Sequence, residues 1–180
     1  LQTYENEISG WAYFAIIARN HKSLKRLFFI LNRRKDEIVQ PILSMSIGKG
    51  FCALAISELH SKQLCLLSYY SSNEINDEQL HQIFSSYDEM NLSFQQVLIS
   101  YNFPEVLLAP MNRYNKEDVR LLLNTTYGNL NSSTLVSELV QEWQMNTIYA
   151  VPHEIHELIT RKFPAVIYRH NFSIAVKHLK

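Results

Sequence analysis

The sequence predicts a mixed α/β fold, and three observations lead to it. Apolar runs over Ile42–Ile47, Phe51–Ser57 and Gln63–Tyr70 are separated by short turns, which is typical of an antiparallel meander. A helical pattern follows Asn76, a good N-cap residue. The next apolar run, Gln95–Tyr101, suits a strand covered on both faces. We therefore expect three antiparallel strands, a helix, and a fourth strand that returns parallel to the first.

Length and composition limit the classes of function. The chain has 180 residues, which is about one domain. Seventeen basic and seventeen acidic side chains leave no formal net charge, so the whole chain gives no argument for a nucleic-acid partner. Residues 1–40 hold seven basic and four acidic groups, or +3, and the remainder holds ten and thirteen, or −3. Only the N-terminal segment is therefore a candidate for binding anionic surfaces.

The N-terminal segment is expected to be helical. Apolar residues recur three, four or seven positions apart over residues 11–35, while several basic residues fall off that face. Pro41 marks the boundary, because a helix rarely continues into the residue before a proline. The predicted domains are an N-terminal helical extension, 1–40, and an α/β domain, 41–180. The basic helix 19–35 either packs on the domain with a solvated basic side or binds an anionic surface.

The second half alternates between strands and helices. The expected strands are Val106–Ala109, Leu135–Trp143, Asn146–Val151 and Ala165–Arg169. The expected helices are Lys116–Leu123, capped by Asn115, then His153–Lys162 and Phe172–Leu179, with a polar loop over Thr125–Thr134. The last helix has little polar surface. We expect it to be covered by residues 1–40 or by a homodimer, because a large exposed apolar patch is unusual in a monomer.

Several motifs resemble a known family. They are Thr147-Ile148-Tyr149-Ala150-Val151-Pro152, then Glu154 and Leu158, Lys162-Phe163-Pro164 and His170, together with Phe94–Pro110 and the hairpin around Gly48 and Phe51. Over residues 42–180 the chain resembles an uncharacterised bacterial family, mainly from Bacteroidota, with an actin-like ATPase (ribonuclease-H-like) fold. The resemblance implies a ribonuclease-H-like lobe, the first of two in a longer protein, and no established activity.

The turn Gly48-Lys49-Gly50 is the candidate cofactor site. In actin-like folds this turn holds phosphates, and an acid at the end of the first strand holds the metal. Here Ser46 stands in that place, and no Asp or Glu lies between Pro41 and Ser57. ATP hydrolysis would lack its main electrostatic contribution. We therefore expect no cofactor, with ATP–magnesium as the alternative, and a plain hairpin turn with glycine at positive φ.

Other chemistry has weaker support. His153 and His156 lie three apart on a predicted helix and could bind a metal with His170, but the polarity of a surface helix explains them and we expect no metal site. Cys52 and Cys65 lack a Cys-x-x-Cys spacing and are expected to be buried free thiols. No nucleophile motif is present, and no catalytic residue is predicted.

Three hypotheses for function follow. The first, which we favour, is a non-catalytic actin-like domain used for protein interaction or assembly, in contact with a protein partner or a second copy through the C-terminal apolar helix. The second is a nucleotide-binding or weak ATPase module that uses Gly48–Gly50. The third is a scaffold that binds anionic surfaces through helix 19–35. The longest apolar run, Trp11–Ala18, is too short to span a membrane, so a soluble cytoplasmic protein is expected.

Overall fold

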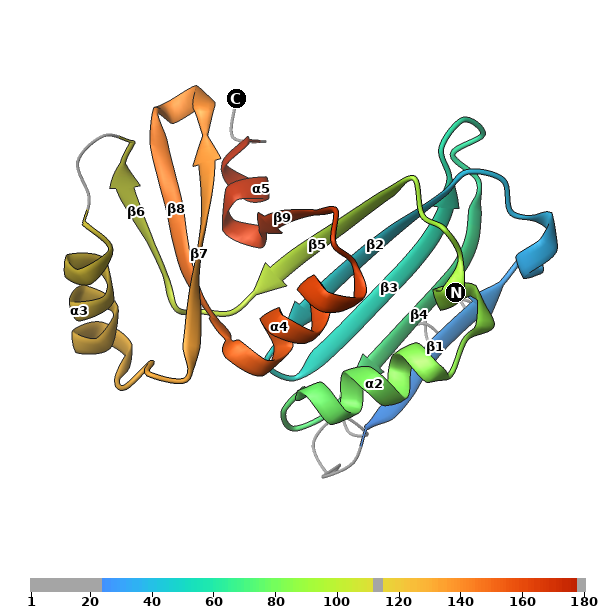
Figure 1. Cartoon of the computed structure of the whole chain (residues 1–180), viewed down its shortest axis with the longest axis horizontal. Coiled ribbons are helices and arrows are strands. Elements are labelled where there is room, and N and C mark those ends of the chain that lie inside the picture. The colour runs from blue at the N-terminus through green and yellow to red at the C-terminus, as the bar shows by residue number, and fades with distance from the viewer. Residues whose placement is uncertain (1–23, 112–114, 178–180) are drawn as a thin grey trace, which may run out of the picture.

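The computed structural model describes residues 24–111 and 115–177 and contains two β-sheets. The large sheet has six strands in the order β1-β4-β3-β2-β5-β9, and the small sheet has three in the order β6-β8-β7 (Figure 1). The strands of the large sheet are β1 (Lys25–Leu31), β2 (Pro41–Gly48), β3 (Phe51–Glu58), β4 (Leu64–Ser71), β5 (Gln96–Asn102) and β9 (Val166–His170). Those of the small sheet are β6 (Val106–Pro110), β7 (Ser133–Val140) and β8 (Met145–Pro152).

The predicted meander and its parallel return are confirmed. Strands β2, β3 and β4 pair antiparallel, and β5 pairs parallel to β2, with Leu43 opposite Val97 and Met45 opposite Ile99. Strand β9 then pairs parallel to β5. The connection between β4 and β5 holds α2 (Asp77–Ser85), whose N-cap Asn76 accepts a hydrogen bond from the backbone N–H of Gln79. The apolar alternation and the cap therefore specify this half of the fold.

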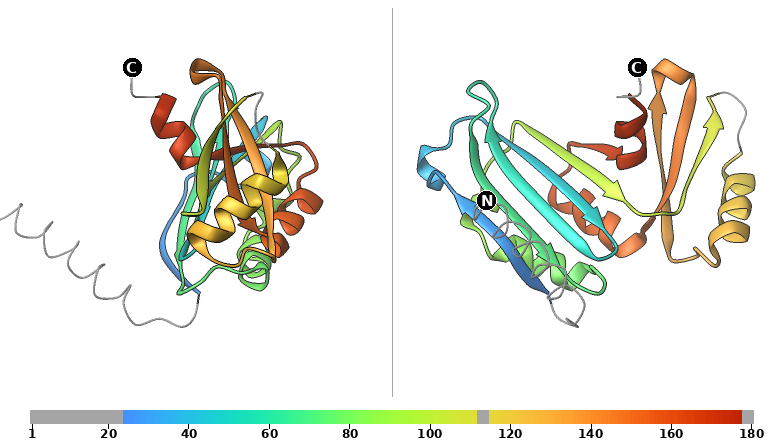
Figure 2. Two further views of the ribbon diagram at one scale, coloured as in Figure 1. Left: turned by 90° about the vertical axis from the view of Figure 1, so that its left-hand side faces the viewer. Right: turned by 180° about the vertical axis from the view of Figure 1, so that it is seen from behind.

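One face of the large sheet is the core. Every second residue of β2 and β3 is buried against α2 and α4 (His153–Lys162), among them Leu43, Ile47, Leu54 and Ile56. Figures 1 and 2 show the two helices on this side, and the left view of Figure 2 shows the last helix, α5 (Asn171–Lys177), on the opposite side, at the end of β9. The alternate residues of β2, β3 and β5 are half-exposed on the opposite face. We call this second surface the open face.

The small sheet is an addition that the sequence analysis did not predict as a separate sheet. Its strands and α3 (Lys116–Tyr127) lie between β5 and α4 in the chain. Ile148 and Ala109 face α3 and form a second small core with Val119 and Leu123. The opposite side of β8 joins the main core through Tyr149 and Val151. This sheet is therefore packed between its own helix and the parallel strands of the large sheet.

Several predicted boundaries shift. Helix α3 extends to Tyr127 and is capped by Gly128, so the predicted polar loop begins later; Thr125 and Thr126 donate their hydroxyls to the carbonyls of Leu121 and Leu122. Strand β7 ends at Val140 and is followed by a 3₁₀ turn, η3 (Gln141–Trp143). Further 3₁₀ turns are η1 (Lys35–Glu37) and η2 (Asp88–Asn91), and the last helix is α5 (Asn171–Lys177). Within the described residues no helix has the length and apolarity needed to cross a membrane.

The predicted N-terminal helix is wrong where the structure describes it. Residues 11–23 of that prediction lie outside the described residues, but Lys25–Leu31 is strand β1, at the edge of the large sheet beside β4. The spacing of Phe28 and Leu31 fitted a helix. Pairing with β4 supplies a ladder of backbone hydrogen bonds that favours the β-prone sequence Leu-Phe-Phe-Ile as a strand. A basic helix 19–35 is therefore excluded for its second half.

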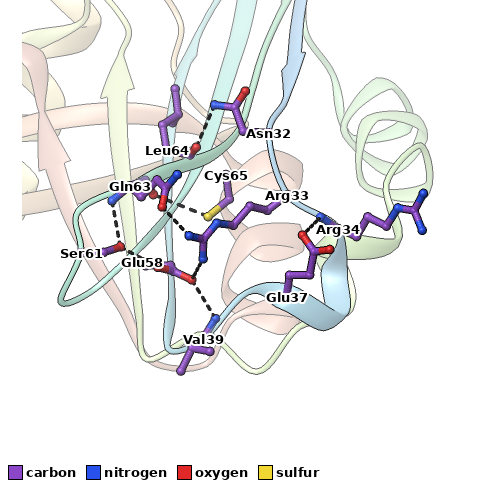
Figure 3. A network of polar contacts seen from close by, with 10 residues as sticks. All are labelled: Asn32, Arg33, Arg34, Glu37, Val39, Glu58, Ser61, Gln63, Leu64 and Cys65. Carbon is purple, nitrogen blue, oxygen red and sulfur yellow. Dashed lines mark hydrogen bonds and ion pairs between the residues drawn. The ribbon is translucent and has the colours of Figure 1, made fainter.

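The segment that follows β1 is tied to the β3–β4 hairpin, as Figure 3 shows. Arg33 donates to the Glu58 carboxylate at 2.8 Å and to the Gln63 side chain. The same carboxylate accepts from the Ser61 hydroxyl at 2.6 Å and from the backbone N–H of Val39 at 3.2 Å. The Ser61 bond, the Val39 bond and the Arg33 charge lower the pKa of Glu58, and burial opposes them. Residues 25–39 are thus part of the α/β body, although the domain prediction placed them outside it.

Candidate functional site at the carboxyl ends of the parallel strands

The carboxyl ends of β2, β5 and β9 meet at the edge of the large sheet that faces the small sheet (Figure 1). Gly48 pairs with Asn102 there, and Tyr101 pairs with His170. Ligands of open α/β sheets bind outside the carboxyl ends of the parallel strands. The predicted turn Gly48-Lys49-Gly50 leaves β2 at this edge, so the sequence placed its candidate at the relevant end of the sheet.

Side-chain packing closes the turn at Gly48. A Cβ added to Gly48 would lie 2.5 Å from Cε1 of Phe51 and 3.1 Å from the carbonyl oxygen of Asn102. The Phe51 ring therefore covers the site where a ligand would approach this backbone, and it stacks on Tyr69 with ring centroids 5.8 Å apart. Among the described glycines only Gly128 has a positive φ, so the expected positive φ at this turn was wrong. Gly48 is required by close packing instead.

The carbonyl groups of the turn are already bonded to the loop between β4 and α2. The Lys49 carbonyl accepts from the Ile75 N–H at 2.7 Å, and the Gly50 carbonyl accepts from the Ser72 N–H at 3.0 Å. A Cβ on Gly50 would lie 3.2 Å from the Ser72 carbonyl oxygen, so the two segments are in close contact. The Lys49 side chain is exposed. The turn is thus fixed between strands and loop, and only the Lys49 side chain projects from it.

A polar row crosses the open face beside the turn. Ser46, the residue at the place of the metal-holding acid, lies opposite Ser100 of β5, and Ser100 lies opposite Arg169 of β9. The Ser100 hydroxyl donates to the side-chain oxygen of Asn171, the first residue of α5. Hydroxyl and amide groups at this position offer hydrogen bonds without the negative charge that a divalent cation requires.

A buried carboxylate joins the two sheets at the same edge. Glu138 of β7 is nearly inaccessible, and its Oε2 accepts the backbone N–H of His170 at 2.9 Å. Its Oε1 lies 3.5 Å from Nε of Arg169, whose side chain is partly exposed. The sequence analysis assigned no role to Glu138. The signal that was present is an acid within an apolar alternating run, which in β7 points toward the core.

His170 is held by two backbone groups. Its Nε2 lies 3.0 Å from the Phe103 carbonyl oxygen, and its Nδ1 accepts the Phe172 N–H at 3.1 Å, so the neutral ring carries its proton on Nε2. Burial lowers the pKa of His170, and the Phe103 carbonyl and the Glu138 charge oppose that effect. The neighbouring Tyr149 ring lies 4.7 Å away and its hydroxyl, although buried, has no hydrogen-bond partner among the described residues.

The three histidines considered as metal ligands serve other contacts. Nδ1 of His153 lies 2.9 Å from the Thr134 hydroxyl, and Nδ1 of His156 lies 3.4 Å from the Tyr101 hydroxyl. Both ring nitrogens of His170 are engaged with the backbone. In the part of the chain that the structure describes, no three His, Cys, Asp or Glu residues group closely enough to hold a metal ion.

Comparison with known proteins supports the fold. A crystal structure from Bacteroides thetaiotaomicron VPI-5482, described as a protein with an actin-like ATPase fold and unknown function, superposes with a TM-score of 0.67 at 12% sequence identity. The match covers 81% of this chain and 58% of that chain, so this chain spans less than two thirds of its length. No curated protein matches the chain significantly.

The resemblance predicted from the sequence is confirmed by both comparisons. The superposed structure has the predicted mixed α/β, actin-like architecture. A family model described as "Protein of unknown function (DUF3822)" matches residues 32–180. The matched region takes in the large sheet from β2 onward and the whole small sheet, but not β1. The chain belongs to this family of proteins of unknown function, DUF3822.

Proposed function

We propose that this chain is a non-catalytic actin-like lobe that acts in the cytoplasm through contacts with protein. The observation that carries the proposal is the packing of Phe51 on Gly48, because it fills the place where the hairpin turn of an actin-like ATPase meets its nucleotide. The bonds from Ser72 and Ile75 to the turn carbonyls fix it in that closed form. Phosphate binding would require the ring and the loop to move together.

The charges at this edge also favour a structural role. Glu138, whose carboxylate lies beside β9, is engaged by the N–H of His170 and by Arg169. It is therefore buried and paired, and it stabilises the junction of the sheets. A carboxylate that holds a nucleotide-bound metal has to present free oxygen atoms to the ion. The buried free thiols Cys52 and Cys65 support a reducing compartment.

The open face supports the protein-contact part of the proposal. Phe28 is 45% exposed and Tyr69 37% exposed, and they lie opposite each other on β1 and β4. Exposed aromatic side chains that form a continuous patch with apolar neighbours are typical of interaction sites. The sequence analysis selected the C-terminal helix as the contact site instead, and Phe172 and Ile174 of α5 are exposed as well.

Calorimetric titration with ATP–magnesium tests the proposal. The wild-type chain should give no heat of specific binding, and a Phe51→Ala variant, which uncovers Gly48, serves as the matched comparison. Micromolar binding by the wild type, abolished by Gly48→Val, would favour the alternative, a nucleotide-binding module that uses Gly48, Lys49 and Gly50. Steady ATP hydrolysis by the wild type, lost in the same variant, would contradict the proposal outright.

A further inference from the structure

The open face has large side chains on one part and small side chains on another, so that two copies of it are complementary in shape. On one side stand the large side chains of Phe28, Tyr69 and Phe51, with Phe51 and Tyr69 stacked at an interplanar angle of 5°. Strand pairing places Phe28 opposite Tyr69, and Tyr69 opposite Ala53 of β3. The bulky residues of this face therefore gather toward β1 and β4. We call them the aromatic ridge.

Small side chains occupy the middle of the same face. Ala53 lies opposite Ser46, and Ala55 lies opposite Ser44, so the centre of β3 and β2 presents only methyl and hydroxymethyl groups. Beyond them, on β5 and β9, Leu98 lies opposite Ile167 and the surface rises again. The face thus has a shallow trough of small residues along β3 and β2, bounded by the aromatic ridge and by these aliphatic residues.

The trough and the ridge carry few charges. In the row that runs from Phe28 across Ala53 and Ser46 to β9, Arg169 is the charged residue, and it lies at the far edge beside Glu138. The row that runs through Leu67 and Ala55 to Ile167 is uncharged, and in the row of Phe51 and Ser71 the charged residue is Lys25, on the edge strand β1. Burying these rows costs little desolvation, because most of the surface is apolar and the serine hydroxyls can bond locally.

We propose that a second copy of this chain covers the open face, with the aromatic ridge of each copy seated in the trough of the other. A two-fold axis makes such a contact self-complementary, because each copy supplies both shapes. Sheets that pack face to face interdigitate their side chains in this way. The inference rests on the proposed function, since it names the protein partner of the same lobe.

The size of the face agrees with a dimer. Six strands about 4.8 Å apart, each about seven residues long at about 3.3 Å per residue, give a flat face of roughly 550 Å². Two such faces amount to roughly 1,100 Å² before the relief of the side chains is counted, which is close to the lower limit for stable protein interfaces. The face is therefore large enough for a reversible dimer.

Sedimentation equilibrium on the full chain tests the inference. Between about 1 and 100 μM the wild type should change from monomer to dimer. Ala55→Arg fills the trough with a charge and Tyr69→Lys removes the ridge, so each should weaken the dimer at least about tenfold while circular dichroism stays that of the wild type. Leu121→Lys, on the exposed side of α3, is the matched control and should leave the dimer intact.

Two variants are used so that misfolding of one does not decide the result. A wild type that stays monomeric at the upper concentration overturns the inference, and so does a dimer that survives both Ala55→Arg and Tyr69→Lys. A dimer abolished equally by Leu121→Lys would place the contact elsewhere and overturn it too. None of these outcomes bears on nucleotide binding, so failure of the dimer and failure of the proposed function are distinguished by the ATP–magnesium titration.

Discussion

The carboxylate of Glu138, in the small sheet, accepts a hydrogen bond at 2.9 Å from the backbone N–H of His170, in the last strand of the large sheet. The bond connects two residues from different sheets, and Arg169 approaches the other carboxylate oxygen at 3.5 Å. The small sheet contacts the parallel strands chiefly through packed apolar residues such as Tyr149 and Val151. Glu138 adds a directional contact that fixes how the two sheets meet.

Replacement of Glu138 by alanine should destabilise the chain by about 2–3 kcal/mol, because it leaves the His170 N–H buried without an acceptor and removes the partner of Arg169. Arg169 is partly solvated, which keeps the loss below that of a fully buried pair. Glu138→Gln retains an acceptor oxygen and should lose about half as much. Urea unfolding followed by circular dichroism measures both. Equal stability of the alanine variant and the wild type would contradict the assigned role.

The titration of His170 should contribute to a loss of stability in acid. Burial lowers the pKa of this imidazole in the folded chain, so the unfolded chain binds the proton more readily. Stability therefore rises with pH through the region near the unfolded value of about 6.5, and falls as the pH is lowered below it. His156 acts in the same direction, because burial and the neighbouring His153 lower its pKa.

Proton NMR of the imidazole Cε1–H groups checks the sign directly. The resonances of His170 and His156 should titrate at a lower pH in the folded chain than in urea. The unfolding free energy, measured from about pH 7.5 to pH 5, should decrease over the same interval. A His170 resonance that titrates above its position in urea would reverse the expected slope and contradict the account of its burial.

The sequence patterns predicted the large sheet because local and tertiary signals agreed there. The alternation in β2 and β3, the Asn76 cap and the apolar run of β5 all indicate the structure that forms. The helix expected over residues 11–35 failed over Lys25–Leu31, because its periodicity there rested on Phe28 and Leu31, which fit a strand equally well. Residues 25–31 form a strand because they pair with the edge of β4, and nothing in their own sequence indicates that this edge is there.

The sequence predicted the hairpin that holds the candidate turn. The motif Gly48-Lys49-Gly50 joins β2 to β3 as expected, at the carboxyl end of β2. What closes the turn comes from further along the chain: Phe51 across the hairpin, and Ser72 and Ile75 beyond β4. The contact of Glu138 with Arg169 and His170 joins residues more than thirty positions apart in the two sheets. Such pairings follow from topology, and spacing in the sequence does not encode them.

The two cysteines should be inert in the folded chain. Burial raises the pKa of Cys52 to about 12 and also raises that of Cys65, so the thiolate that reacts with alkylating agents is scarce at neutral pH. Ellman's reagent at pH 8 should label neither thiol in native buffer and both in guanidinium chloride. The denatured sample is the control for reagent activity. Rapid labelling of either cysteine in native buffer would show that its strand opens easily.

The contact of Gly48 with Phe51 predicts a non-additive pair of substitutions. Gly48→Ala places a methyl group 2.5 Å from Cε1 of Phe51, so the ring has to shift, and the chain should lose about 1–3 kcal/mol of stability. Phe51→Ala alone loses the ring's packing on Tyr69. In the double variant the clash with the ring is absent, although the Asn102 carbonyl oxygen at 3.1 Å still limits the space.

The double variant should therefore be more stable than the sum of the single losses predicts, by about 0.5–2 kcal/mol. Gly128→Ala is the contrasting substitution, because nothing lies within 4 Å of its Cβ and its cost comes from the positive φ of 92° instead. That cost should add to the loss of Phe51→Ala without coupling. Urea unfolding of the two double-mutant cycles measures both energies. Additive losses at Gly48 and Phe51 would show that the ring does not cover the turn, and would favour the hypothesis that this edge of the sheet binds phosphate.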